Sequence, residues 1–245
     1  MKVKSFIRNI ITICLIIVIC ICGYKIYSKL YEYKKADNIY NDLRKEKNYT
    51  NKNSSNKTNK NKENSIDFSH INKDFVCWIN IKNTNIDYPV VQGDDNSYYL
   101  HRDIYGNYLY AGTTFLDYRN NYNDSKNLIV YGHNMKNGSM FGTLKQYKLQ
   151  ETIDKSPYFW IITPDEAYKY KIFAVYTANV DGDTYTLIKG PGTETVEYGE
   201  SMKSKSDIDM GEYEFKQTDK MVTLSTCTGD SATRFVVQGV RVDPE

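Results

Sequence analysis

The chain after residue 65 is dominated by short strand-like runs rich in aromatic and β-branched residues. Clusters of Gly, Asn, Asp and Pro separate these runs. The eight runs are 75–81, 86–92, 112–118, 127–133, 158–163, 167–180, 220–227 and 234–242. Short helical patterns occur near 96–100, 139–147 and 193–203. Because strands and helices do not alternate regularly, the sequence predicts a mainly β fold, either a closed barrel or a sandwich with a few short helices.

The N-terminal segment is apolar and predicts a membrane anchor. Residues 10–24 carry no charge. Extension to residue 27, with Arg8 and Lys25 reaching back to the membrane surface, approaches the roughly 20 residues that a span needs. The small-residue site expected after a cleaved signal peptide is absent from the sequence, which favours an uncleaved anchor. We expect a short tail at 1–9 and a transmembrane helix at 10–27.

The segment between anchor and body is polar and basic. Residues 28–49 could form a short helix, and residues 48–65 are almost entirely Asn, Lys, Ser and Thr, which bury too little apolar surface to fold. Residues 1–65 carry 14 Lys and Arg against five acids, whereas residues 66–245 carry 18 against 25. An acidic body argues against nucleic-acid binding, and a basic arm fits an anionic membrane surface. We expect a flexible linker at 28–65 and one domain at 66–245.

Two cysteines lie outside the apolar segment, and one of them is a candidate nucleophile. Cys77 lies within a strand-like run and is interpreted as a buried small hydrophobe. Cys227 ends the seventh run, and a cysteine nucleophile needs a neighbouring base or cation. His133, where the fourth run opens into a loop, is the best partner by context, and His101 is the second. Arg234 begins the eighth run and would stabilise an oxyanion beside Cys227 if the two runs are antiparallel neighbours.

Each of these residues alone is more often structural than catalytic, but the motifs around them resemble those of sortases, in particular the class B group. The stretch "TLSTC" at 223–227 is similar to the cysteine signature of that family. The stretch "YGHNMKNGSMFGTL" at 131–144 is similar to the class B histidine segment, and "TRFVVQG" at 233–239 resembles the strand that carries the family arginine. The resemblance covers residues 74–242.

This resemblance implies a closed sortase-type β-barrel of about eight strands and a cysteine transpeptidase. It implies that Cys227 is the nucleophile, His133 the general acid and base, and Arg234 the oxyanion-stabilising residue. Ser225 matches a position that contributes to the substrate groove. The chemistry needs no metal or other cofactor. The implied topology is single-pass in the cell membrane, with residues 1–9 cytoplasmic and the catalytic domain extracellular.

The partners implied by the resemblance are secreted proteins with a C-terminal sorting motif and an amine of a cell-wall peptide. The motif would be similar to Asn-Pro-x-Thr-Asn or to Ser/Pro-Pro-x-Thr-Gly, cleaved after Thr through a thioester. Turnover is expected to be slow, because unperturbed Cys and His favour the protonation states opposite to those required. Two alternatives stay open: a wall peptidase or amidase that hydrolyses its acyl-enzyme, and a non-enzymatic barrel that binds wall polymers.

Overall fold

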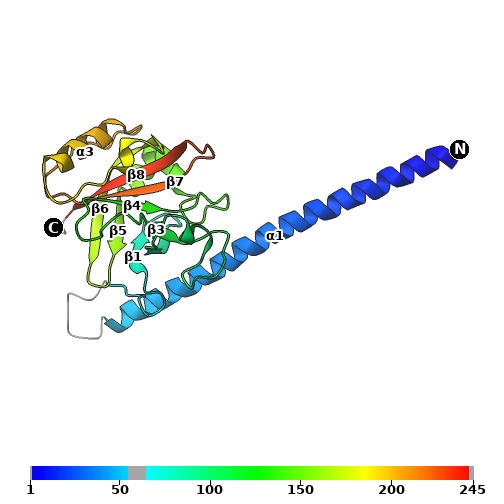
Figure 1. Cartoon of the computed structure of the whole chain (residues 1–245), viewed down its shortest axis with the longest axis horizontal. Helices are drawn as coiled ribbons and strands as arrows, with labels where there is room; N and C mark the ends of the chain where they lie inside the picture. The colour runs from blue at the N-terminus through cyan, green and yellow to red at the C-terminus, as the bar shows by residue number, and fades with distance from the viewer. Residues whose placement is uncertain (1, 55–64, 243–245) are drawn as a thin grey trace.

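Eight strands close into a barrel beside a long N-terminal helix (Figure 1). The computed structural model describes residues 2–54 and 65–242, with side chains described for 6–48 and 65–242. The strands are β1 Phe75–Asn80, β2 Asp87–Val91, β3 Thr114–Leu116, β4 Asn127–Tyr131, β5 Tyr158–Ile162, β6 Ala167–Asn179, β7 Met221–Cys227 and β8 Thr233–Val242. All eight predicted runs form strands, which confirms the mainly β prediction and selects the closed barrel over the sandwich.

The strand order around the barrel is β1-β2-β3-β4-β7-β8-β6-β5, and β5 pairs with β1 to close it. Two neighbouring pairs, β2 with β3 and β4 with β7, are parallel, and the other pairs are antiparallel. The parallel pairing of β4 with β7 matters most for function. It places the carboxyl ends of both strands at the same edge of the barrel.

The shorter helices lie in the connections between strands. They are the 3₁₀ helices η2 Tyr98–His101, η3 Leu144–Lys148 and η4 Asp183–Tyr185, and the α-helices α2 Gln150–Lys155 and α3 Thr193–Ser204. Three of them fall where the sequence predicted helical stretches. The sequence analysis did not identify α2 and η4, which are six and three residues long.

Apolar side chains fill both faces of the sheet formed by β6, β7 and β8. Inside the barrel, buried residues such as Phe159, Ile161 and Leu224 form the main core. On the outer face, Phe173 and Met221 pack beneath α3 in a second cluster. Because both faces are covered, these strands also bury polar side chains, among them Thr223 and Ser225 of β7 and Gln238 of β8.

The helix α1 spans Lys2–Ser54. It includes the short helix that the sequence allowed at 28–49, and residues 28–54 belong to one continuous helix rather than to the flexible linker predicted at 28–65. Ala36, Tyr40 and Leu43 are buried against the barrel. The Tyr40 hydroxyl donates to the carbonyl oxygen of Gly112. Spacings of four and three residues place these side chains on one face of the helix. These three apolar positions are not obvious in the sequence because the residues around them are polar. Residues 55–64 of the expected linker lie outside the described residues.

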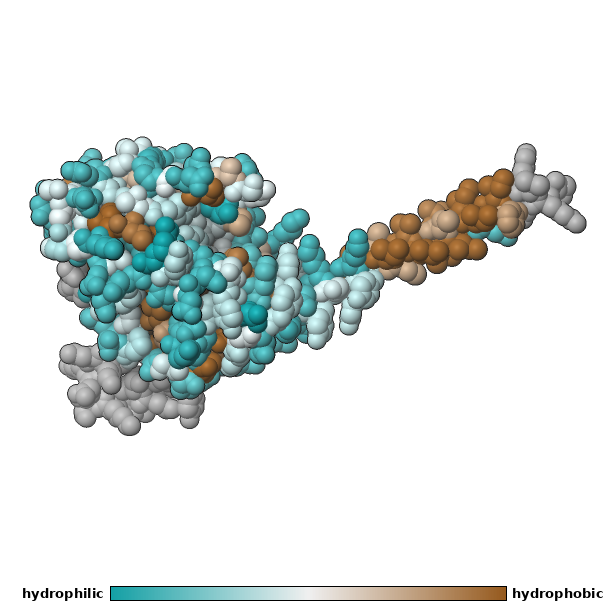
Figure 2. All heavy atoms as spheres, in the orientation of Figure 1, coloured by the Kyte–Doolittle hydropathy of each residue, from teal (hydrophilic) through white to brown (hydrophobic). Residues whose placement is uncertain are grey.

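The N-terminal half of α1 leaves the barrel and is apolar (Figures 1 and 2). Within the described part of the chain, this is the helix that is long and apolar enough to cross a membrane. The barrel buries none of its most apolar 18-residue window. In Figure 2 a largely polar stretch separates this apolar segment from the barrel.

Candidate active site

Cys227 and His133 lie side by side because of the register between β4 and β7. In this parallel pair Tyr131 is the partner of Ser225. His133 and Cys227 each follow two residues later. Because side chains alternate along extended backbone, a step of two returns to the same face. The register therefore directs the histidine and the cysteine toward the same side of the barrel edge.

Hydrogen bonds beyond the end of the β4–β7 ladder hold the two segments together. The Thr226 hydroxyl donates to the carbonyl oxygen of Gly132 at 2.7 Å. The Asn134 side-chain amide donates to the carbonyl oxygen of Cys227, also at 2.7 Å. These contacts lie directly before and after His133 in the chain. They fix the backbone from which both reactive side chains extend.

Arg234 lies opposite Cys227 on the neighbouring strand. The two residues are partners in the antiparallel ladder of β7 and β8, which confirms the predicted pairing of these strands. Such partners have their side chains on the same face of the sheet. The Arg234 guanidinium donates through Nη1 to the carbonyl oxygens of Ser231 at 3.0 Å and Thr233 at 2.8 Å. The loop between β7 and β8 thus holds the cation at the edge of the groove.

All four site residues predicted from the sequence line one hollow of about 260 Å³. Its lining residues are Asn96, Leu100, Phe115, Tyr131, Gly132, His133, Ser225, Thr226, Cys227 and Arg234. Cys227 is exposed, whereas His133 and Arg234 are half-buried. A thiol, an imidazole and a guanidinium that share one hollow can together form and stabilise a covalent tetrahedral adduct.

The carbonyl oxygen of Leu100 fixes the orientation of the His133 ring. It lies 2.8 Å from Nε2, and because a carbonyl can only accept, Nε2 carries the proton. In the neutral ring Nδ1 is then the unprotonated nitrogen. His101 stacks on the ring of His133, with centroids 5.4 Å apart and an interplanar angle of 22°. Of the two candidate histidines, His133 lines the groove, and His101 packs against the ring of His133.

The surroundings of His133 lower its pKa. Burial is the main cause, because it disfavours the charged imidazolium. The hydrogen bond to Leu100 acts in the opposite direction, and the neighbouring charge of His101 lowers the pKa further. The site consequently favours the neutral ring at neutral pH.

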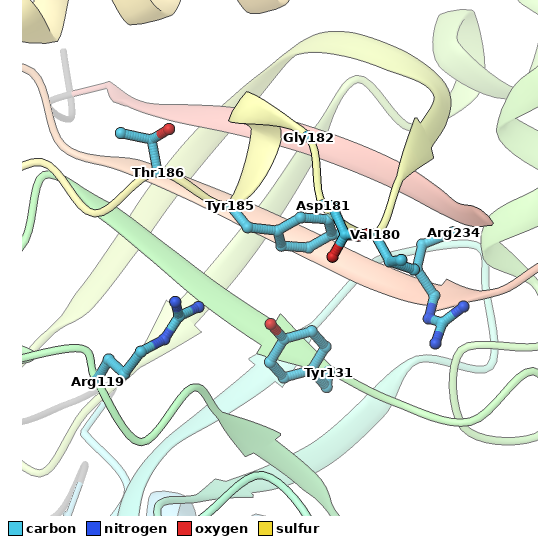
Figure 3. Close-up of a pocket in the computed structure, with 8 residues that line it drawn as sticks. All are labelled: Arg119, Tyr131, Val180, Asp181, Gly182, Tyr185, Thr186 and Arg234. Carbon is cyan, nitrogen blue, oxygen red and sulfur yellow. The ribbon is translucent and has the colours of Figure 1, made fainter. Parts of the chain in front are cut away.

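Two stacked tyrosines form a wall of the groove that sequence analysis did not identify. Tyr131 and Tyr185 have ring centroids 6.3 Å apart at 20°. The hydroxyls of Tyr185 and Ser225 are 3.0 Å apart. Figure 3 shows both rings between Arg119 and Arg234, in a second hollow of about 420 Å³. Tyr131 stands in the histidine motif, two positions before His133, so the sequence could indicate its place near the site. Tyr185 lies in η4, between β6 and β7, and no motif marks it.

A buried carboxylate fixes the Tyr131 side of this wall. Asp117 accepts hydrogen bonds from the Tyr131 hydroxyl at 2.9 Å, from Arg119 at 2.8 and 2.9 Å, and from the Asn96 amide at 3.1 Å. Burial acts to raise the pKa of Asp117, but the hydrogen bonds from Arg119 and Tyr131 outweigh it, so the pKa lies below its usual range. The carboxylate therefore stays charged and holds groove-lining side chains in place.

Cys77 is buried in β1, as the sequence predicted. Burial raises the pKa of its thiol far above the usual range. A thiol in such surroundings is unreactive, because the thiolate is the nucleophilic form. Cys227, by contrast, is a free and exposed thiol.

Comparisons with known proteins assign the family. The sortase domain family matches residues 79–242. Sortase B of Listeria monocytogenes is 34% identical over 98% of both chains, and sortase B of Staphylococcus aureus is 28% identical over 97% of both. The X-ray structure of Clostridium perfringens sortase B superposes with a TM-score of 0.67 at 34% identity, over 71% of this chain and 97% of that one. The chain belongs to the sortase family of cysteine transpeptidases, within its class B group.

Proposed function

We propose that this chain is a membrane-anchored transpeptidase that joins secreted proteins to the cell wall. In this proposal the substrate carries a C-terminal sorting motif that is cleaved after Thr, and the acceptor is a cell-wall peptide amine. The observation that carries the proposal is the shared groove. Cys227, His133 and Arg234 line one hollow at the edge where β4, β7 and β8 meet.

The first half-reaction acylates the cysteine. The Cys227 thiolate attacks the carbonyl carbon of the motif threonine, and a carbon–sulfur bond forms. The Arg234 guanidinium stabilises the negative charge that develops on the carbonyl oxygen. When the adduct collapses, the carbon–nitrogen bond breaks and His133 donates its proton to the leaving amine. A thioester on Cys227 and a released C-terminal fragment result.

The second half-reaction transfers the acyl group. The acceptor amine attacks the thioester carbonyl, and the neutral His133 ring accepts its proton. The carbon–sulfur bond breaks and the Cys227 thiolate is regenerated. Because the Leu100 carbonyl occupies Nε2–H, we assign both proton transfers to Nδ1.

The acylation step requires thiolate and imidazolium together. Burial lowers the pKa of His133, so the imidazolium is a minority form at neutral pH. Only molecules that hold this form can protonate the leaving amine. We therefore infer slow acylation, as the sequence predicted.

Substrate binding involves Ser225 and the tyrosine wall in this proposal. The Ser225 hydroxyl bonds to Tyr185, which stacks on Tyr131. Together they shape the side of the groove beside Cys227. A Staphylococcus aureus sortase B–substrate complex, 27% identical with a TM-score of 0.66, covers 72% of this chain and 83% of that one. A motif of the Asn-Pro-x-Thr-Asn or Ser/Pro-Pro-x-Thr-Gly type would enter the groove along this wall.

The proposed location rests on α1. Its apolar N-terminal half would cross the membrane once, with residues 1–9 on the cytoplasmic side and the barrel outside. Anchoring supports the proposed function because it keeps the enzyme where secreted precursors emerge. The length and composition of the helix support a membrane span.

Product analysis tests the proposal. The full chain in detergent micelles is incubated with labelled peptides of both motif types, with and without a glycine-based amine. We expect a ligated product with one motif type, lost in Cys227→Ala and retained in the matched control Cys77→Ala. Removal of the general acid in His133→Ala should slow acylation about 10²–10⁴-fold.

Two outcomes would contradict the proposal in different ways. Hydrolysis products alone, even with abundant amine, would indicate a peptidase or amidase. A Cys227 that reacts with neither peptide type and is inert to thiol reagents would favour a wall-binding module without catalysis.

A further inference from the structure

Two exposed tyrosines of the barrel lie beside the part of α1 that follows its apolar segment. The loop that carries Tyr108 and Tyr110 forms a shared hollow of about 500 Å³ with this helix. The lining residues are Tyr24, Lys25, Ser28, Lys29, Glu32, Tyr108 and Tyr110. Lys35 of α1 also donates a hydrogen bond to the carbonyl oxygen of Tyr108 at 2.9 Å. The loop is therefore fixed alongside the helix.

The helix sets the height of this loop above a membrane. The uncharged run ends at Tyr24, and Glu32 lies eight residues further along, about 12 Å at 1.5 Å per residue. The headgroup region of each leaflet is roughly 5–8 Å thick beyond the hydrocarbon core. If the uncharged run lies in the core, the hollow begins at headgroup level. Tyr108 and Tyr110 then lie in or directly above the headgroups.

The side chains at this level have the chemistry of a membrane interface. Tyr108 is 61% exposed and Tyr110 41%, and on the helix Tyr24, Tyr27 and Tyr31 are each more than half exposed. Tyrosine is enriched at membrane interfaces because its ring is apolar and its hydroxyl is polar.

The charges around these tyrosines suit an anionic lipid surface. Lys25 and Lys29 line the hollow, and Glu32 is the acid beside them. Lys35 adds a further cation at the Tyr108 backbone. Lysines just outside a span attract anionic lipid headgroups. The balance at this level is basic, although the body as a whole is acidic.

We propose that this end of the barrel rests on the outer surface of the bilayer, with Tyr108 and Tyr110 as a second lipid contact beside the anchor helix. The inference rests on the proposed membrane anchoring of α1. It goes further, because a single anchor would let the barrel stand clear of the lipid.

A series of ring contacts links this lipid contact to the active site. Tyr110 stacks on His101 with centroids 6.2 Å apart, and His101 stacks on His133 at 5.4 Å. The groove is thus held close to the lipid surface. Figure 1 shows the connection between β7 and β8 on the side of the barrel toward which α1 departs. A groove at that level meets substrates that are still attached to the membrane.

Tryptophan quenching tests the depth of the loop. The full chain is reconstituted into vesicles of phosphatidylcholine and phosphatidylglycerol, with or without bromine on the upper part of the acyl chains. Tyr108→Trp reports the proposed contact, Ile16→Trp reports the anchor, and Glu200→Trp on α3 is the exposed control. The emission of Trp78 and Trp160 in the unaltered chain is subtracted.

We expect brominated lipid to reduce the added emission of Tyr108→Trp and Ile16→Trp and to leave that of Glu200→Trp unchanged. Quenching at position 16 without quenching at position 108 would overturn the lipid contact and leave the anchor intact. Absence of quenching at position 16 would overturn the anchor itself, and the lipid contact with it. A blue-shifted but unquenched signal at position 108 would instead assign this surface to a protein neighbour.

Discussion

At the scale of single residues, the two stacked histidines are the most testable feature of the site. His101 lies against the ring of His133, and its charge lowers the pKa of His133 in addition to the larger effect of burial. His101→Gln removes that charge and keeps a polar side chain. We expect the midpoint of the His133 titration, followed by NMR of the imidazole protons, to move to higher pH.

The chain has three histidines, so the resonances can be assigned by single substitutions. His70→Gln, near the start of the body, is the matched control and should leave the His133 midpoint unchanged. An unchanged or lower midpoint in His101→Gln would contradict the electrostatic role of His101. The acylation rate should follow the midpoint, because a larger imidazolium fraction is then available at neutral pH.

The carboxylate of Asp117 makes stability depend on pH. Its pKa is lowered in the folded protein, so it contributes stability that is present above its unfolded pKa of about 3.9 and is lost as pH falls through the folded value. Asp117→Asn should reduce stability at pH 7 by about 1–3 kcal/mol, since Arg119 and Tyr131 lose a charged acceptor. Thermal unfolding at pH 7 and pH 2.5 measures both effects.

The difference between Asp117→Asn and the unaltered chain should shrink at pH 2.5, which lies below the unfolded pKa of about 3.9. Asp124→Asn, an exposed aspartate, is the control and should change the unfolding temperature little at either pH. An equal loss of stability by Asp117→Asn at both pH values would show that the carboxylate charge is not what stabilises the wall.

The residues that the sequence could identify are those whose signal is local. Cys227, His133 and Arg234 stand in short motifs beside strand ends, and the structure brings them to one hollow. Tyr185 reaches the same site from the η4 connection, 42 positions before Cys227. Its place depends on how β6, β7 and β8 pair, which no local pattern encodes. Short sequence motifs identified Cys227, His133 and Arg234, whereas only the pairing of the strands in the folded protein brings Tyr185 to the site.

At the scale of elements, α1 shows where local patterns mislead. The sequence around residues 28–54 is polar enough to suggest a linker, yet a stripe of Ala36, Tyr40 and Leu43 docks on the barrel. Three apolar positions in a polar helix are a weak signal. They become visible only when the complementary surface of the barrel is known.

The docking of α1 can be weakened at one position. Leu43 is fully buried, and Leu43→Ala should cost about 2–4 kcal/mol of local stability. Hydrogen exchange of the amides in 36–47 should accelerate, whereas the strands β7 and β8 should keep their protection. Leu30→Ala, at a position 59% exposed on the same helix, is the matched control. Equal exchange in both variants would mean that the stripe does not hold the helix.

At the scale of the whole molecule, the closed barrel and the rigid helix place the active site. Eight runs were recognisable in the sequence, but closure requires β1 to pair with β5, as in Trp78 with Ile162. Such a pairing joins residues 84 positions apart, and single-sequence periodicity carries no information about it. Strand existence was therefore predictable, and strand order was not.

The folded structure also shows where the basic and acidic parts of the chain lie. The basic arm includes α1, and its lysines stand where the helix leaves its apolar segment, whereas the acids are concentrated in residues 66–245. An anionic bilayer attracts the basic part of α1 and repels the acidic domain at 66–245. This distribution of charge favours lipid contact only at the loop that carries Tyr108 and Tyr110.

The covalent intermediate tests the central claim most directly. The full chain is incubated with a sorting-motif peptide without acceptor amine, and its intact mass and peptide map are recorded. We expect a mass increase equal to the peptide truncated after Thr less one water, located on Cys227 and removed by added amine with release of the ligated product. An unmodified Cys227 beside consumed peptide, or an adduct on another residue, would contradict the account.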